Sequence, residues 1–119
     1  MNNPPAATFG WKLADGSPAP DMKATMYGDW IDMQDFTTCA FDFFWTTTGS
    51  PAGTISFQVS NDRILAYTFA AETPYGPGGS PTQSNADNLT TSMAFIRAVY
   101  TPDSGGTGAV MTGRCQRKG

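Results

Sequence analysis

Residues 53–62, Gly-Thr-Ile-Ser-Phe-Gln-Val-Ser-Asn-Asp, alternate apolar and polar side chains through their middle. Ile55, Phe57 and Val59 fall on one face of an extended chain, and hydroxyl or amide side chains fall on the other. A period of two with β-branched and aromatic residues predicts a β-strand with one buried face. Such a strand needs neighbouring strands and a second layer over its apolar face. The stretch therefore predicts a protein built of β-sheets.

A longer pattern of the same kind precedes this stretch, at residues 36–47. Its apolar face carries Cys39, Phe41, Phe43 and Trp45. Phe44 on the opposite face indicates that this face is partly covered too, so we expect the strand in the middle of a sheet. Turn-forming residues at 49–53 follow it and predict a hairpin with residues 53–62.

The remaining strands are predicted by one further strong alternation, at residues 93–101, and by shorter patterns elsewhere. They lie at residues 23–27, within 28–35, at 64–69, at 88–92 (a strand or a turn), at 93–101 and at 107–114. A tight turn at residues 102–106 leads into the last strand, and residues 71–88 form a long Pro- and Gly-rich loop. A loop of that length usually serves a function or an interface, or is mobile. About six to eight strands without a helical pattern predict an all-β sandwich or barrel.

The chain of 119 residues has the length of one domain. Residues 21–119 form the predicted β-domain, and residues 1–20 form an extended N-terminal arm rich in Pro, Ala and Gly. Phe9 and Trp11 are the large apolar anchors of this arm. Two alternatives are open for them: they pack onto their own domain, or they contact a neighbouring subunit as hot spots.

Composition and charge exclude several classes of function. Charged residues make up 14% of the chain and the formal net charge is −3, whereas nucleic-acid-binding proteins usually carry a basic patch. No window of about 18 apolar residues predicts a membrane span. Residues 1–7 lack a positive segment and an apolar segment, so we expect no secretory signal and synthesis in a reducing cytosol.

The two cysteines, Cys39 and Cys115, fall in different predicted strands. A disulfide between them requires that those strands be adjacent. A reducing cytosol favours two small buried thiols instead.

The residues needed for common catalytic and metal sites are missing. The absence of histidine excludes Ser-His-Asp and Cys-His catalysis, and two isolated cysteines cannot form a structural zinc site. Asp29, Asp32 and Asp35 do not follow the spacing of a calcium-binding EF-hand, so we expect them to be solvated. We expect no enzymatic activity, no cofactor and no metal. Arg97 falls on the outward face of its predicted strand, where we expect a surface ion pair, with Asp42 as a candidate partner, in preference to a contact with another protein.

Four blocks of the sequence resemble a pattern found in small virion proteins of tailed bacteriophages. The blocks are residues 43–46 (Phe-Phe-Trp-Thr), 53–62, 95–102 (Phe-Ile-Arg-Ala-Val-Tyr-Thr-Pro) and 104–108 (Ser-Gly-Gly-Thr-Gly). In those proteins the first half of the pattern is a core hairpin and the second half is a hairpin near the C-terminus. The resemblance covers about residues 36–113. It implies a single antiparallel β-sandwich of the jelly-roll or discoidin-like type.

The resemblance also implies a structural role in a phage particle. The chain would be a capsid cement or decoration subunit, or a small head, neck or tail component, made in the host cytoplasm and located in the virion. Its partners would be the major capsid protein or other virion proteins, and it would assemble as a homo-oligomer, a trimer by preference, or on the capsid itself. Arms ordered by neighbours become structured only on such assembly. Neither nucleic acid nor a membrane is an expected partner.

Carbohydrate binding is the alternative function, because discoidin-like sandwiches often bind sugars through loops at one end. Tyr75 in the long loop, with Trp30 or Trp11, would then form a stacking platform for a sugar ring. The candidate contact residues are therefore Phe9, Trp11 and Tyr75.

Overall fold

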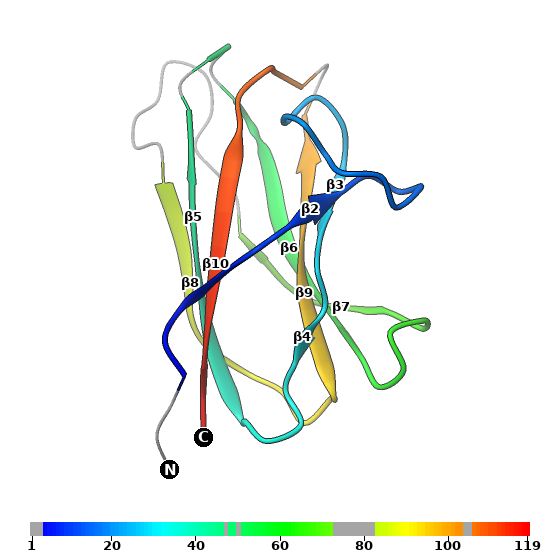
Figure 1. Cartoon of the computed structure of the whole chain (residues 1–119), viewed down its shortest axis with the longest axis vertical. Helices are drawn as coiled ribbons and strands as arrows, with labels where there is room; N and C mark the ends of the chain where they lie inside the picture. Colours follow the sequence, from blue (N-terminus) through cyan, green and yellow to red (C-terminus); the bar gives the residue numbers. More distant parts are fainter. Residues whose placement is uncertain (1–3, 47, 50, 73–82, 104–105) are drawn as a thin grey trace.

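The computed structural model describes residues 4–46, 48–49, 51–72, 83–103 and 106–119 of the chain. These residues form ten β-strands and no helix, in two antiparallel sheets packed face to face (Figure 1). The predicted all-β class and the single sandwich are confirmed.

The first sheet has the strand order β1-β10-β5-β8. Its members are β1 (Ala7–Phe9), β10 (Met111–Lys118), β5 (Thr38–Trp45) and β8 (Gln83–Thr90). As predicted, β5 lies inside the sheet, between β10 and β8. Strand β8 begins at Gln83, inside the stretch predicted to be a long loop.

The second sheet has the order β2-β3-β9-β6-β7. Its members are β2 (Trp11–Lys12), β3 (Met26–Gly28), β9 (Phe95–Pro102), β6 (Gly53–Ser60) and β7 (Tyr67–Glu72). A short strand, β4 (Ile31–Asp32), pairs with the same strand β9 at Ile96 and Phe95.

Successive strands cross repeatedly from one sheet to the other. In chain order, β1, β5, β8 and β10 belong to the first sheet, and β3, β6, β7 and β9 belong to the second. The first and last strands, β1 and β10, are neighbours. This alternation is the strand order of a jelly roll, which is built from two Greek keys.

The predicted hairpin between residues 36–47 and 53–62 is wrong. These residues form β5 and β6, which lie in different sheets, and β6 pairs with β9 and β7 instead. Each strand has one apolar face, and these faces meet across the core: the Phe41 and Phe57 ring centroids are 4.9 Å apart. The implied C-terminal hairpin is wrong for the same reason, because β9 and β10 also lie in different sheets.

The predicted inward faces are confirmed. Ile55, Phe57 and Val59 of β6 are buried, as are the alternating residues of β5. The core also contains Ile96, Ala98 and Tyr100 of β9, Met22, Met26 and Met33, and Ala109 and Met111. The regular alternation in these strands thus reports which side chains fill the space between the sheets.

The extended arm predicted for residues 1–20 requires correction in its described part. The segment from β1 to β2, blue in Figure 1, passes from β10 in one sheet to β3 in the other. Phe9 and Trp11 are buried in the core cluster, so the sandwich includes these strands. The space for Phe9 comes from two glycines: a Cβ at Gly28 would lie 2.7 Å from its ring, and a Cβ at Gly113 would overlap it.

Candidate functional site

Two of the three candidate contact residues, Phe9 and Trp11, lie in the core of the sandwich. Phe9 and Trp11 pack edge to face against each other in the core, with ring centroids 5.2 Å apart, so they offer no surface to a partner or a sugar. Of the two alternatives left open for them, the structure shows packing onto their own domain. Tyr75 lies outside the described residues. Trp30 is partly buried and stacks against Arg97, whose guanidinium lies 4.3 Å from its ring centroid.

The predicted ion pair between Arg97 and Asp42 is wrong. Asp42 lies on β5 in the first sheet and accepts two hydrogen bonds from Arg114 on the neighbouring strand. Arg97 lies on β9 in the second sheet, where its Nε donates to the Oε1 of Gln58 over 2.9 Å. The two residues therefore belong to different sheets.

The cysteines lie on the adjacent strands β5 and β10, yet they are free thiols. Both are buried. Cys39 stands opposite Arg117 and Cys115 opposite Phe41, so the two thiols are diagonal neighbours on the buried face. The Cys115 thiol is hydrogen-bonded to Cys39 and buried, and both effects raise its pKa. Burial keeps both thiols away from reagents and substrates, so we interpret this pair as core packing.

Of the three aspartates considered as metal ligands, Asp29 and Asp32 have partners within the chain, and Asp35 is exposed. Asp29 accepts a hydrogen bond from the backbone N–H of Gly10 and forms an ion pair with Lys12 at 3.2 Å. Asp32 caps the backbone N–H of Gln34. Within the described ranges, no three Asp, Glu, Cys or His side chains converge to hold a metal ion.

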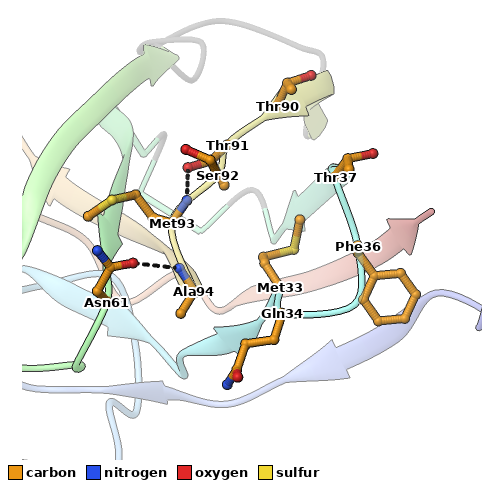
Figure 2. A pocket seen from close by; sticks show the side chains of 10 residues that line it. All are labelled: Met33, Gln34, Phe36, Thr37, Asn61, Thr90, Thr91, Ser92, Met93 and Ala94. Atoms are coloured by element: carbon orange, nitrogen blue, oxygen red, sulfur yellow. Dashed lines mark hydrogen bonds between the residues drawn. The ribbon is translucent and has the colours of Figure 1, made fainter.

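A pocket of about 450 Å³ opens at one end of the sandwich (Figure 2). We call it the end pocket. Three connections build it: the segment between β4 and β5, the residue that follows β6, and the segment between β8 and β9. It is lined by Met33, Gln34, Phe36, Thr37, Asn61, Thr90, Thr91, Ser92, Met93 and Ala94.

Two hydrogen bonds hold the walls of the end pocket in place, both drawn in Figure 2. The Oδ1 of Asn61 accepts from the backbone N–H of Ala94 over 3.0 Å, which ties the end of β6 to the start of β9. The Oγ1 of Thr91 accepts from the N–H of Met93 over 3.0 Å. Hydroxyl and amide groups line the pocket beside Met and Phe side chains, without a charged group. Such a surface can bind a neutral polar ligand but offers no acid or base.

Exposed apolar side chains gather on another surface, where β6 turns into β7. Ile64, Leu65, Tyr67 and Phe69 are 81%, 63%, 57% and 38% exposed. We call these four residues the apolar corner. Large side chains at such exposure in neighbouring positions commonly mark an interaction surface.

The turn that carries the apolar corner is held by its own side chains. The carboxylate of Asp62 accepts hydrogen bonds from the backbone N–H groups of Ile64 and Leu65, at 2.8 and 2.9 Å. These bonds lower the pKa of Asp62. The Oγ of Ser60 accepts from the N–H of Arg63, which adopts a positive φ of 64°. The turn therefore presents Ile64 and Leu65 to solvent in a defined conformation.

Sequence reasoning assigned residues 64–69 to a strand and so missed the apolar corner. A local signal was available, because Ile64 and Leu65 are adjacent and cannot both point inward from one strand. The end pocket left no comparable signal, because its walls come from segments far apart in the sequence.

Comparison of the sequence with models of protein families and with curated proteins finds no match. Among the described residues there is no helix that could span a membrane. The fold defines the chain as a jelly-roll β-sandwich with an exposed apolar corner and a neutral end pocket.

Proposed function

We propose that this chain is a structural protein of a bacteriophage virion, a cement or decoration subunit that binds the head shell. Its partner in this proposal is the major capsid protein or another virion protein, and it assembles as a trimer or on the capsid. The jelly-roll strand order supports the proposal, since this architecture recurs in capsid proteins and lectins.

The apolar corner is the observation that carries the proposal. Ile64 and Leu65 extend from a turn that is already ordered by Asp62 and Ser60, so little conformational entropy is lost when a partner covers them. Burying two aliphatic side chains and the rings of Tyr67 and Phe69 would supply the apolar centre of an interface.

Strand β7 adds a second feature beside the apolar corner. It is the outer strand of its sheet and pairs with β6 on one side. An outer strand offers backbone N–H and C=O groups to a further strand from a partner. The apolar corner and this edge together fit a subunit that docks onto a repeated surface.

The test uses purified particles of the phage that encodes the chain. Quantitative mass spectrometry should find the chain in stoichiometric amount, and a reconstruction of the particle should place it on the head shell. Density at the neck or tail would identify a component of those parts instead. If the chain were missing from purified particles, the proposal would be wrong.

A binding assay then tests the apolar corner itself. Recombinant chain should bind shells that lack it, and the double variant Ile64→Ser, Leu65→Ser should bind at least about tenfold more weakly, because its apolar contact is lost. Val110→Ser is the matched control, since Val110 is 51% exposed on the connection between β9 and β10. Equal loss of binding in both variants would show that the apolar corner is not the binding surface.

Carbohydrate binding is the second candidate, and the end pocket is the observation that favours it. Its neutral hydroxyl and amide groups beside apolar side chains suit a sugar, which presents both kinds of surface. A glycan array should give binding that Gln34→Ala and Thr37→Ala weaken, because both residues line the end pocket. An array without signal would exclude this candidate.

A further inference from the structure

A second pocket lies over the outer face of the second sheet, away from the end pocket. It has a volume of about 320 Å³ and is lined by Lys12, Leu13, Ala14, Gly16, Tyr27 and Arg97. We call it the arginine pocket. The segment after β2 forms one wall, and side chains of β3 and β9 form the other. Its volume is within the range of about 300–1,000 Å³ typical of ligand sites.

The guanidinium of Arg97 is held in one orientation at this pocket. Its Nε donates a hydrogen bond to the Oε1 of Gln58, at 2.9 Å. The ring centroids of Tyr27 and Trp30 lie 4.8 and 4.3 Å from its central carbon. These cation–π contacts and the single hydrogen bond fix the plane of the group. Its two terminal nitrogens donate no further hydrogen bond to the described residues, so their N–H groups remain available to a ligand.

The charge of Arg97 has no counterpart in the described part of the protein. Ion pairs join Lys12 to Asp29, Lys23 to Asp21 and Arg114 to Asp42. Arg97 is partly buried, and this burial lowers its pKa. A partly desolvated cation is less stable without a carboxylate than with one, and proteins usually pair such a group. An anion from outside the chain would fill this role.

The charge balance of the arginine pocket indicates which anion fits. Lys12 at its edge is already neutralised by Asp29, which also accepts from the N–H of Gly10. The site therefore carries one net positive charge, from Arg97. A monoanion matches this charge, whereas a phosphate dianion would leave one negative charge unbalanced.

We propose that the arginine pocket binds the carboxylate of a small ligand, with Arg97 as its bidentate partner. A planar carboxylate matches the fork of donors on a guanidinium. Leu13, Ala14 and the ring of Tyr27 form apolar walls that suit a compact ligand body. Two sources supply this chemistry: an acidic sugar and a short organic acid. The inference does not depend on the virion proposal.

The test is an NMR titration of the ¹⁵N-labelled chain that follows the side-chain Nε–Hε signal of Arg97. Sodium glucuronate represents the acidic sugars and sodium butyrate the organic acids. Glucose and inorganic phosphate are the comparison probes. A saturable shift with either carboxylate supports the proposal and identifies its source. If neither carboxylate shifted the signal, or if glucose or phosphate bound with equal affinity, the proposal would be wrong.

Variants separate recognition by Arg97 from effects on the fold. Arg97→Lys keeps the charge but loses the fork of donors, so it should weaken carboxylate binding by about tenfold. Arg114→Lys is the matched control, because Arg114 lies in the other sheet and is already paired with Asp42. Here the backbone signals of Tyr27 and Lys12 report binding, and circular dichroism confirms folding. If Arg97→Lys bound as tightly as the wild type, Arg97 would not be the partner.

Discussion

The ring of Phe9 occupies the space left by the missing side chain of Gly113, its partner across β1 and β10. This relationship explains why a segment rich in Pro, Ala and Gly belongs to the sandwich. Phe9 also packs edge to face against Phe41 and Phe43, with ring centroids 5.8 and 6.4 Å away. A glycine on the last strand thus allows the first strand to contribute an aromatic ring to the core.

We expect Gly113→Ala to destabilise the protein by about 1–3 kcal/mol, because the added methyl group overlaps the Phe9 ring. Gly108→Ala is the control: no atom lies within 4 Å of its added Cβ, so its effect should stay within about 0.5 kcal/mol. Urea denaturation measures both values. In the double variant Phe9→Leu, Gly113→Ala, the smaller side chain should recover part of the loss. Additive effects of the two substitutions would contradict the contact.

The burial of Tyr100 predicts that the folded protein loses stability at high pH. Its buried hydroxyl donates to the carbonyl of Ala52, and burial raises its pKa to about 12. Because the unfolded chain ionises first, near its ordinary value of 10.0, this stabilisation is complete below pH 10 and is lost as the pH rises to 12. The free energy of unfolding, measured by denaturation, should be about 2–3 kcal/mol lower at pH 12 than at pH 9.

Two variants separate the contribution of Tyr100 from those of other groups. Tyr100→Phe should flatten the pH dependence above 10 and cost about 1 kcal/mol at pH 7, the value of a lost hydrogen bond. Tyr67→Phe should leave the dependence unchanged, because Tyr67 is exposed. An unchanged slope in Tyr100→Phe would show that another group titrates.

The hydrogen bonds of Asp62 predict that the folded protein loses stability at low pH. Hydrogen bonds from Ile64, Leu65 and Ser60 lower its pKa, so their contribution is complete above its ordinary value of 3.8 and is lost as the pH falls below it. Asp62→Ala should therefore lower the Tm at pH 7 more than at pH 2. Asp62→Asn keeps one acceptor oxygen and should have a smaller effect. Equal Tm losses at both pH values would exclude a role for the ionised carboxylate.

Ile64 and Ile55 provide a direct comparison of an exposed and a buried isoleucine. Ile55 is fully buried, so Ile55→Ala should cost about 2–5 kcal/mol. Ile64 is 81% exposed, so Ile64→Ala should change the stability of the isolated chain by no more than about 0.5 kcal/mol. A large loss in Ile64→Ala, measured by urea denaturation at low protein concentration, would indicate packing within the chain.

The cysteines provide a test of core accessibility. Both thiols are buried, and the hydrogen bond and burial raise the pKa of Cys115, so a thiol reagent at pH 8 should not label the native chain. Two thiols should react in guanidinium chloride without a reductant. Rapid labelling of the native state would show that the β5 and β10 region opens readily. A disulfide would leave no thiol to label.

Local sequence pattern predicted much of the secondary structure and core. Phe57 on β6 and Phe41 on β5 both have inward positions that follow from alternation alone, and both are buried. The alternation did not predict which strands lie beside β5 and β6 in the sheets. Strand β6 pairs with β9, about forty residues later in the chain, and no local feature distinguishes that partner from β5.

The functional surfaces were predicted less well, for a related reason. The alternation that marks β9 placed Arg97 on the outer face, yet its contacts with Gln58 and Trp30 depend on which strands lie beside it. The end pocket likewise brings Asn61 together with Ala94. Tyr75, the aromatic residue expected to matter in the long loop, lies outside the described residues.

The sequence by itself determined that the chain is all-β and which faces of its main strands are buried, because both depend on side-chain polarity repeating every two residues. The tertiary structure decided the jelly-roll pairing, the burial of Phe9 against Gly113 and the surroundings of Arg97. These features depend on contacts between residues far apart in the chain. Such contacts are selected by how side chains pack and pair across the whole domain, which no short stretch of sequence contains.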